Sequence, residues 1–591
     1  MQVYNAPLRD MRFVLHELHG ADPLPAHKDF TPELVDSILE EAAKFCTEML
    51  LPLNASGDLE GCTYENGVVH TPKGFKEAYK GFSEAGWGAL NADPQYGGQG
   101  APETLAKLVE EMICSTNLSF GLYPGLSHGA YLALESHGAE ELKNQYLPKL
   151  VSGEWSGTMC LTEPHCGTDL GMLRTKAVPQ EDGSYKITGA KIFISAGEHD
   201  MSENIIHLVL ARLPDAPPGI KGISLFLVPK FLPDANNKPG ERNGVSCAAI
   251  EHKMGIKASA TCQMNFDDAK GWLVGTPHKG MQAMFVMMNS ERLSVGTQGL
   301  GLGEVSYQSA VAYARERLQG RSLSGVKFPD KPADPLIVHP DIRRNLLTMR
   351  AYNEGCRALC VWVAQAMDRA NHGTTPEERE TADEFVALLT PVVKALFTDL
   401  GFDCANLAMQ TYGGHGYIRD HGIEQFARDA RIAMIYEGTN GVQALDLVGR
   451  KLPAHMGRYL RRFFHPVEDF IEGNSNHPFL GKMVQGFGRA FGALQLATAF
   501  IAEKGMADPE EAGAAATDYL RLFGLVALGY MWCRMALLSV EKLGHGEDDF
   551  YQAKIGTARF FMERILPQAG SLLFTIKAGK APLMDMPEAA F

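Results

Sequence analysis

The chain has 591 residues, a formal net charge of −15, and a composition that is 45% hydrophobic and 21% charged. This length predicts several domains with a large buried core, and the composition excludes a disordered chain. The acidic balance argues against nucleic acid as a partner, because a phosphate-binding surface needs a clustered positive excess.

The sequence shows neither the pattern of a signal peptide nor the cysteine and histidine spacings of common metal sites. The N-terminal stretch contains acids and no apolar core, which is not typical of a signal peptide. The eleven cysteines include no C-x-x-C pair, and the nineteen histidines show no H-E-x-x-H spacing. We therefore expect a cytoplasmic protein with reduced, mostly buried thiols and no metal site.

Residues 1 to about 150 have the pattern of a helical region. The first long segment combines an N-cap at Thr31, apolar residues at helical spacing, and Pro52, which is expected to mark its end. Further helices are predicted in "APETLAKLVEEMICS" and in "AEELKNQYLPKLVSG", which Gly153 closes.

From about residue 151 to 275 the hydrophobic period becomes that of β-strands. Short β-rich runs are separated by turn residues: "GSYKITGAKIFISAG", "NIIHLVLARL" and "KGISLFLVPKF". We expect a β-domain inserted between helical regions.

Helices return from about residue 276 and are interrupted by the proline-rich loop "FPDKPADPLIVHPD". Residues 452–591 are predicted to form a further helical block, which starts near "GRYLRRFFH". This basic run is predicted to be a solvated helix face in preference to a contact with an anionic membrane. The most hydrophobic segment, 521–540, contains Arg534 and is predicted to be a buried helix rather than a membrane span.

Two motifs suggest chemistry. In "CLTEPHCGTDLG" (160–171), a polar turn with Thr162 and Thr168 directly precedes β-rich sequence. Backbone N–H groups there could hold a phosphate or a flat polar ring, and a solvated turn is the alternative. In "MIYEGTNGVQ" (434–443), Glu437 ends an apolar stretch before a helix start, where a capping or solvated acid is the alternative to a catalytic one.

The glycine-rich stretches "QYGGQG", "GTQGLGLGE" and "TYGGHGY" do not join a strand to a helix, so no Rossmann site is predicted.

Several motifs in a fixed order resemble the acyl-CoA dehydrogenase family over about residues 35–451. They are "TEPHCGTD", "GSYKITGAKIFIS", "KMGIKASATCQMNFDDA", "YARERLQGR", "QTYGGHGY" and "RDARIAMIYEGTNGVQ". The resemblance implies an α+β multidomain fold: a helical domain, a middle β-barrel or β-sandwich domain and a four-helix bundle, with FAD bound between them, plus an extra C-terminal helical domain. The boundaries expected on this basis are 1–34 (extension), 35–157 (N-terminal helical), 158–275 (middle), 276–451 (bundle) and 452–591 (additional helical).

The resemblance also implies the reaction. Glu437 would take the α-proton of an acyl-CoA thioester and flavin N5 would take the β-hydride, giving a trans-2-enoyl-CoA. The Glu437 backbone N–H and a ribityl hydroxyl would polarise the thioester carbonyl. Burial beside Tyr436 and Ile435 would raise the pKa of such a base, and the helix that follows would oppose this. Glu291 stands where some members carry the base, and here it is expected to be a neighbour paired with an arginine.

By the same resemblance, binding residues can be assigned. Arg317 would reach the pyrophosphate of FAD in a partner subunit, although Gly320 and Arg321 replace a Phe-Gly pair nearby and Gly441 replaces a common glutamine. The full set for FAD is Leu161, Thr162, Gly167, Thr168, Phe193, Ser195, Arg317, Gln410, Gly414 and Thr439. The set for the substrate is Thr168, Asn289, Arg292, Glu437 and Gly438.

The expected function is therefore FAD-dependent dehydrogenation of a fatty acyl-CoA in β-oxidation, by a homodimer that passes electrons to an electron-transfer flavoprotein. A second candidate substrate is 3-methylthiopropanoyl-CoA, because the enlarged bacterial branch that this chain resembles contains both activities. An acyl-CoA oxidase and a non-catalytic helical assembly factor also stay open as interpretations of the sequence.

Overall fold

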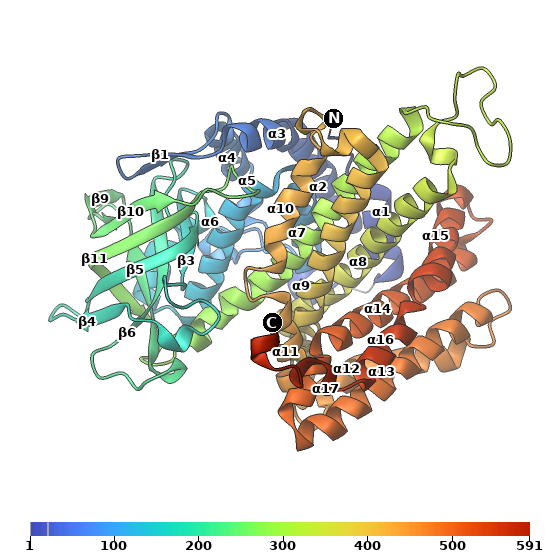
Figure 1. Ribbon diagram of the computed structural model, residues 1–591. Helices are drawn as coiled ribbons and strands as arrows, with labels where there is room; N and C mark the ends of the chain where they lie inside the picture. The colour runs from blue at the N-terminus through green and yellow to red at the C-terminus, as the bar shows by residue number, and fades with distance from the viewer. Residues whose placement is uncertain (1, 21–22) are drawn as a thin grey trace. The chain divides into compact units, whose positions relative to one another are not determined.

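A computed structural model describes residues 2–20 and 23–591 (Figure 1). These residues divide into two compact units. Unit 1 comprises Met1–Ala43, Pro102–Ser115 and Val295–Phe591, and unit 2 comprises Lys44–Ala101 and Thr116–Ser294. Two long helices, α5 (Glu103–His137) and α7 (Gly280–Glu316), contribute residues to both units. The helical geometry of α5 breaks at Asn117, next to the division between the units. The five expected domain boundaries stay predictions.

Unit 2 is built around a seven-stranded sheet. Its strand order is β10-β11-β5-β4-β6-β3, and β7 pairs with β11 and β6. Pairing is antiparallel except where β6 runs parallel to β3 and β4. The three predicted β-rich runs are confirmed as β5 (Tyr185–Ser195), β6 (Asn204–Arg212) and β7 (Ile223–Pro229). The other strands of the sheet are β3 (Trp155–Cys160), β4 (Lys176–Pro179), β10 (Val245–Ile250) and β11 (Thr261–Val274).

Helices α5 and α6 share a hydrophobic core with this sheet. Trp155 at the start of β3 and Tyr146 of α6 (Glu140–Val151) are fully buried in the same core cluster. The other helices that lie wholly in this unit are α3 (Leu51–Glu60) and α4 (Phe75–Glu84). Gly153 has a φ of +76° after α6, as its predicted closing role requires.

Two local predictions for this region were wrong. Pro52 does not end a helix, because it lies in the first turn of α3. Proline is tolerated there, since the N–H groups of the first turn have no acceptor within the helix. The region before residue 150 also contains a hairpin, β1 (Thr63–Glu65) with β2 (Val68–His70). Its turn is Asn66-Gly67, and both residues have positive φ, as a two-residue hairpin turn favours. A second small pair, β8 (Phe231–Pro233) with β9 (Pro239–Arg242), extends from the middle region.

Unit 1 is helical. The predicted N-cap is confirmed, since Leu34 N donates to Thr31 Oγ1 at 3.4 Å at the start of α2. The antiparallel helices α8 and α9 form its centre, and the predicted block from residue 452 is confirmed as helical. The helices are α1 (Leu8–Arg12), α2 (Pro32–Phe45), α8 (Pro340–His372), α9 (Pro376–Tyr412), α10 (Glu424–Arg431), α11 (Asn440–Asp446), α12 (Arg458–Asn474), α13 (Gly481–Ala507), α14 (Pro509–Lys542), α15 (Asp548–Phe560), α16 (Gln568–Lys577) and α17 (Ala581–Met584).

Two stretches are long and apolar enough to cross a membrane, Pro376–Tyr417 and Pro509–Lys542. In each of them 78% of the most apolar window is buried inside the protein. Both are therefore core helices of unit 1, which confirms the prediction of a buried helix over 521–540. All eleven cysteines lie among the described residues; none of them forms a disulfide, and all are buried except Cys62, which is half-buried.

A buried ion network connects the N-terminal helix to the bundle in unit 1. The Arg357 guanidinium on α8 is 1% exposed and donates to the carboxylate of Glu111 at 3.0 Å and to that of Glu304 at 2.9 Å. It also donates to Asp10 of α1. Lys554 of α15 shares Asp10 with Arg357, so the C-terminal helices join the same network.

Within this network Glu111 keeps its proton to a higher pH than an ordinary glutamate. Burial, assisted by the nearby carboxylates of Glu304 and Asp10, raises the pKa of Glu111 to about 7, although Arg357 opposes the shift. In the unfolded chain Glu111 loses its proton near its ordinary value of 4.5. The folded state therefore binds an extra proton between these two values, and the free energy of unfolding falls as pH rises through this window.

We predict that Glu111→Gln removes this slope. Because the amide does not ionise, the stability of Glu111→Gln relative to wild type should rise by about 2 to 3 kcal/mol between pH 5 and pH 8. Urea unfolding at each pH measures the difference, and the exposed-residue variant Glu77→Gln is the control. A stability difference that stays constant with pH would contradict the prediction.

Candidate active site

The first candidate motif forms a tight turn directly after β3 in unit 2. Glu163 and Cys166 exchange two backbone hydrogen bonds, at 2.9 and 3.0 Å. The Glu163 carboxylate then accepts from the backbone N–H groups of Arg174 at 2.7 Å and Thr175 at 3.0 Å. The loop is therefore closed on itself around one buried acid.

A buried lysine holds this loop against the sheet. Lys191 Nζ, on β5, lies 2.9 Å from Glu163 Oε1 and 2.9 Å from the carbonyl oxygen of Leu161. Both charged side chains are almost completely buried. Burial alone would raise the pKa of Glu163, but the ammonium and the other donors hold it at about 2. The ion pair thus fixes the peptide of Leu161, one of the predicted cofactor contacts.

An aromatic ring is presented beside this loop. Ile192 N donates to Thr162 O at 2.9 Å, which joins the loop to the end of β5. The next residue, Phe193, has a φ of +58° and leaves 60% of its surface exposed. Ser195 follows, and its carbonyl oxygen accepts from Thr158 Oγ1. The structure therefore brings the predicted residues Leu161, Thr162, Phe193 and Ser195 together, with Gly167 and Thr168 exposed on the same loop.

This arrangement fits the isoalloxazine part of FAD. A flat ring needs an aromatic cover and edge donors, and the exposed Phe193 ring lies beside a loop with hydroxyls and backbone N–H groups. Gly167 is exposed on that loop, and a Cβ there would make only an ordinary contact with Thr162 Cγ2, at 3.4 Å. Glu163, Lys191 and Thr158 were not assigned a role from the sequence, although all three lie within or next to the motifs.

The same turn gathers three groups of the kinds that bind metals: Glu163, His165 and Cys166. Their hydrogen bonds indicate a different role. His165 Nε2 lies 3.0 Å from the carbonyl oxygen of Met172 and so acts as a donor there. Glu163 is already engaged by Lys191 and by backbone N–H groups. The cluster is a hydrogen-bonded turn that shapes the loop.

The residues predicted to meet the CoA side of the substrate lie on the part of α7 that belongs to unit 2. Arg292 Nη1 donates to Asn289 Oδ1 at 3.3 Å, so these two form one polar group. Glu291 points to another surface: it is 6% exposed, and its Oε1 lies 2.8 Å from where a Cβ on Gly129 would stand. Glu291 is therefore packed against α5 through a glycine.

The second motif, in unit 1, places Glu437 in a left-handed turn. Glu437 has a φ of +56° and is half-buried, and Gly438 follows with +84°. Thr439 then caps α11, since its Oγ1 accepts from Val442 N at 3.2 Å. Ile435, the expected apolar neighbour, is 47% exposed where a 3₁₀ turn ends, so the burial of the acid by the substrate stays a prediction. Tyr436 is anchored by a hydrogen bond from its hydroxyl to Gln298.

The remaining predicted cofactor residues lie at helix ends in unit 1. Gln410 and Gly414 are exposed at the end of α9, and a Cβ on Gly414 would meet nothing within 4 Å. Arg317 is exposed just after α7. The departures from the family pattern that follow it build a loop: Gly320 has a φ of +70°, and Arg321 donates to Phe328 O, to Lys331 O and to the buried Asp334.

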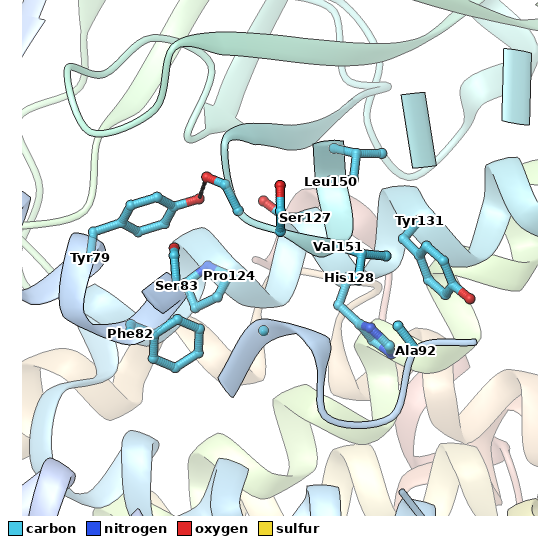
Figure 2. Close-up of a pocket in the computed structure, with 13 residues that line it drawn as sticks. Tyr79, Phe82, Ser83, Ala92, Pro124, Ser127, His128, Tyr131, Leu150 and Val151 are labelled. Carbon is cyan, nitrogen blue, oxygen red and sulfur yellow. Dashed lines mark hydrogen bonds between the residues drawn. The ribbon is translucent and has the colours of Figure 1, made fainter. Parts of the chain in front are cut away.

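A small cavity of about 20 Å³ in unit 2 lies between α4, α5 and the end of α6 (Figure 2). Two of its hydroxyls are paired with the backbone. Tyr79 OH donates to Gly153 O at 3.1 Å, and Tyr131 OH accepts from Asp93 N at 2.9 Å. His128 also lines the cavity, and its Nε2 lies 3.3 Å from Asn91 Nδ2. A cavity of this size has room for about one water molecule and not for a substrate.

Comparison with known proteins covers nearly the whole chain. Residues 33–154, 158–269 and 278–452 match the N-terminal, middle and C-terminal domains of acyl-CoA dehydrogenase. Residues 463–587 match the family described as "Acetyl-CoA dehydrogenase C-terminal like". Together these matches span from the region after the N-terminal extension to the last helix.

Individual relatives agree with these matches. A 3-methylmercaptopropionyl-CoA dehydrogenase of Ruegeria pomeroyi is 42% identical over 96% of this chain and 97% of its own length. A butyryl-CoA dehydrogenase of Syntrophomonas wolfei is 34% identical over 100% of this chain and 99% of its own. Among solved structures, an acyl-CoA dehydrogenase complexed with FAD from Bacillus anthracis has a TM-score of 0.75 at 20% identity, covering 94% of this chain and 90% of that one.

We predict that Phe193 contributes to flavin binding through its ring. Phe193→Ala should weaken FAD binding about 5- to 20-fold, because a stacked aromatic ring contributes on the order of 1–2 kcal/mol. Phe193→Trp should bind FAD within about twofold of wild type, since it keeps the aromatic cover. Reconstitution of the apoprotein with FAD, followed by flavin fluorescence, measures both constants. An unchanged affinity in Phe193→Ala would refute the role.

Proposed function

Because the chain belongs to the acyl-CoA dehydrogenase family, we propose that Glu437 is the base that removes the α-proton of its acyl-CoA substrate. The chain is a FAD-dependent acyl-CoA dehydrogenase, and FAD, when bound, supplies the acceptor for the β-hydride. What remains to be assigned is which acid acts, on which acyl group, and what receives the electrons.

The observation that carries the assignment is the backbone of Glu437. A non-glycine residue costs about 1–2 kcal/mol in the left-handed region, so the turn would be easier to form with glycine. An acid retained in such a position, half-buried and before a capped helix, is best explained by a function of its side chain. Glu291, by contrast, is packed against Gly129 in unit 2.

Each residue of the proposed site has a separate task. The Glu437 carboxylate takes the α-proton, and its backbone N–H donates to the thioester carbonyl on which negative charge develops. The loop of Leu161, Thr162 and Thr168 and the ring of Phe193 orient the isoalloxazine. Arg292 and Asn289 bind polar groups of CoA, for which a guanidinium is well suited.

We predict that Glu437→Gln abolishes flavin reduction. Because the amide cannot accept the α-proton, the rate of flavin bleaching by a reactive acyl-CoA should fall by at least about 10³-fold, at the upper part of the range for loss of a general base. Glu291→Gln should keep the rate within about tenfold of wild type, because its acid lies outside the proposed chemistry. Anaerobic stopped-flow absorbance of the flavin measures both. The reverse pattern would assign the base to Glu291.

A short, unbranched acyl chain is the proposed substrate class, with fatty acyl-CoA in β-oxidation as the first candidate. The two relatives described above support it: a butyryl group has three heavy atoms beyond its carbonyl carbon, and a 3-methylmercaptopropionyl group has four. The second candidate is 3-methylthiopropanoyl-CoA itself, which the 42% identity of the R. pomeroyi relative favours. Its chain has the same length as a pentanoyl group, with sulfur in place of one methylene.

The electron acceptor, the assembly and the compartment are also proposed. Reduced flavin requires an oxidant, and an electron-transfer flavoprotein is the acceptor that the family resemblance implies. A homodimer is supported by Arg317, which is exposed and is assigned by resemblance to FAD in a partner subunit. A cytoplasmic location is supported by the eleven cysteines, all described and none of them in a disulfide.

We predict the strongest flavin bleaching with acyl chains of about four to five carbons. Anaerobic titration with a series of acyl-CoA lengths should show this optimum, and pentanoyl-CoA against 3-methylthiopropanoyl-CoA is the matched pair that separates the two candidates. Reduced enzyme should react slowly with air and rapidly with an electron-transfer flavoprotein. An optimum at long chains would refute the substrate class, and rapid reoxidation in air would indicate an oxidase. A flavin that no acyl-CoA bleaches would support a non-catalytic assembly factor.

A further inference from the structure

Lys394 occupies an unusual position for a lysine. It lies in the apolar run "PVVKALF" near the middle of α9 in unit 1, and its side chain is fully buried. Lysine is almost never fully buried unless its ammonium is paired, because removing the charge from water is costly. Its partners therefore indicate why it is there.

The partners of Lys394 belong to the turn that carries Glu437. Its Nζ donates to the carbonyl oxygen of Gly438 at 2.8 Å and to Asn440 Oδ1 at 2.9 Å. These residues are the first and third after Glu437. The ammonium thus contacts the turn from the core side, in a dry environment where a charge-assisted hydrogen bond is strong.

The Asn440 amide is itself held in one orientation. Its Nδ2 donates to Asp399 Oδ1 at 2.7 Å and to Thr398 Oγ1 at 3.0 Å, both on α9. The Oδ1 atom is consequently turned toward Lys394. The helix α9 therefore fixes the start of α11 through a rigid polar cluster.

A second side chain, that of Gln443, also donates hydrogen bonds to the Glu437–Gly438 turn. Gln443 is buried on α11, and its Nε2 lies 3.1 Å from the carbonyl oxygen of Glu437 and 3.2 Å from that of Gly438. Both carbonyl groups of the left-handed pair are thus engaged. Gly438 O accepts from Lys394 and Gln443 together, so this one peptide group is fixed from two helices.

We propose that Lys394 is a positioning residue that holds the left-handed Glu437–Gly438 turn in its reactive conformation. This inference rests on the proposed role of Glu437. The Glu437 carboxylate and backbone N–H leave the same turn, so a rotation of the Gly438 peptide would redirect both. Without the ammonium, Gly438 O loses its strongest donor and the turn gains access to other backbone conformations.

Lys394→Met tests the inference, because methionine fills a similar volume without charge or donor. Under anaerobic conditions and at saturating acyl-CoA, flavin reduction should slow by about 100-fold, which is the effect of a misplacement near 1 Å. The acyl-CoA concentration at half-maximal rate should change by less than about threefold, and the flavin content should be that of wild type. Leu388→Ala, a cavity variant in the buried part of the same helix, is the control and should leave the rate within about twofold of wild type.

A measurement that does not depend on turnover separates positioning from general stability. Hydrogen exchange of the segment 434–443 should accelerate in Lys394→Met and stay unchanged in Leu388→Ala. Ethylammonium added to Lys394→Ala should restore part of the lost reduction rate, and ethanol, which carries no charge, should not. If Lys394→Met does not fold, Lys394→Gln takes its place, with the same loss of rate and faster loop exchange expected.

The outcomes are distinguishable. An unchanged reduction rate or unchanged loop exchange in Lys394→Met, or an equal loss of rate in Leu388→Ala, overturns the role of Lys394. If wild type is bleached and Glu437→Gln is not, the function of Glu437 stands even when the role of Lys394 fails. If Glu437→Gln is bleached as fast as wild type, the proposed base itself is wrong.

Discussion

A guanidinium that is almost completely buried must be surrounded by acceptors, and Arg357 meets this requirement with acids from three separate segments. Asp10, Glu111 and Glu304 come from the N-terminal helix, α5 and α7. A buried charge that loses a partner costs roughly 3–5 kcal/mol, far more than the intact pair contributes. These segments must therefore be docked together for unit 1 to fold. Lys554 extends the same requirement to α15, so the N-terminal extension and the C-terminal block are parts of one folded unit.

The same physical requirement appears at both functional loops, where a buried lysine supplies the donor. Lys191 bonds to the carbonyl oxygen of Leu161, and Lys394 bonds to that of Gly438. A loop has carbonyl groups that no helix or sheet satisfies, and burying them unpaired is costly. An ammonium group offers three donors at the end of a long stem, so it can reach such carbonyls from a neighbouring strand or helix. Each lysine thereby fixes the backbone of a loop relative to the strand or helix that carries the lysine.

Most of the fold could be predicted because its signals are local. The strands of unit 2 are apolar or alternating runs between turn residues, and the helices have caps and periodicity. The hairpin has a local signal in the dipeptide Asn66-Gly67, which favours a two-residue turn. The position of Pro52 cannot be decided locally, because a proline is equally compatible with the end of one helix and the first turn of the next.

The site could be predicted in its residues but not in its supports. Glu437, Phe193 and the loop after β3 follow from motifs, whereas the lysines beneath them act through contacts distant in sequence. A single cation in the apolar run "PVVKALF" does signal a buried partner for Lys394. Which carbonyl would meet it depends on how the segment after residue 434 folds back over α9, and no local pattern contains that information.

Backbone strain gives a further reason to connect the two motifs. Phe193 and Glu437 both have positive φ, at +58° and +56°, and neither is a residue that the left-handed region favours. Glycine at either position would relieve about 1–2 kcal/mol of local strain. It would also remove the aromatic ring in one case and the carboxylate in the other. The strained residues are tolerated because surrounding hydrogen bonds determine the backbone: Ile192 N to Thr162 O beside Phe193, and Lys394 with Gln443 beyond Glu437. Each strained residue therefore lies beside a hydrogen-bonded support that contains a buried lysine. If Phe193 and Glu437 are needed for the reaction, the lysines that hold their loops are expected to affect its rate as well.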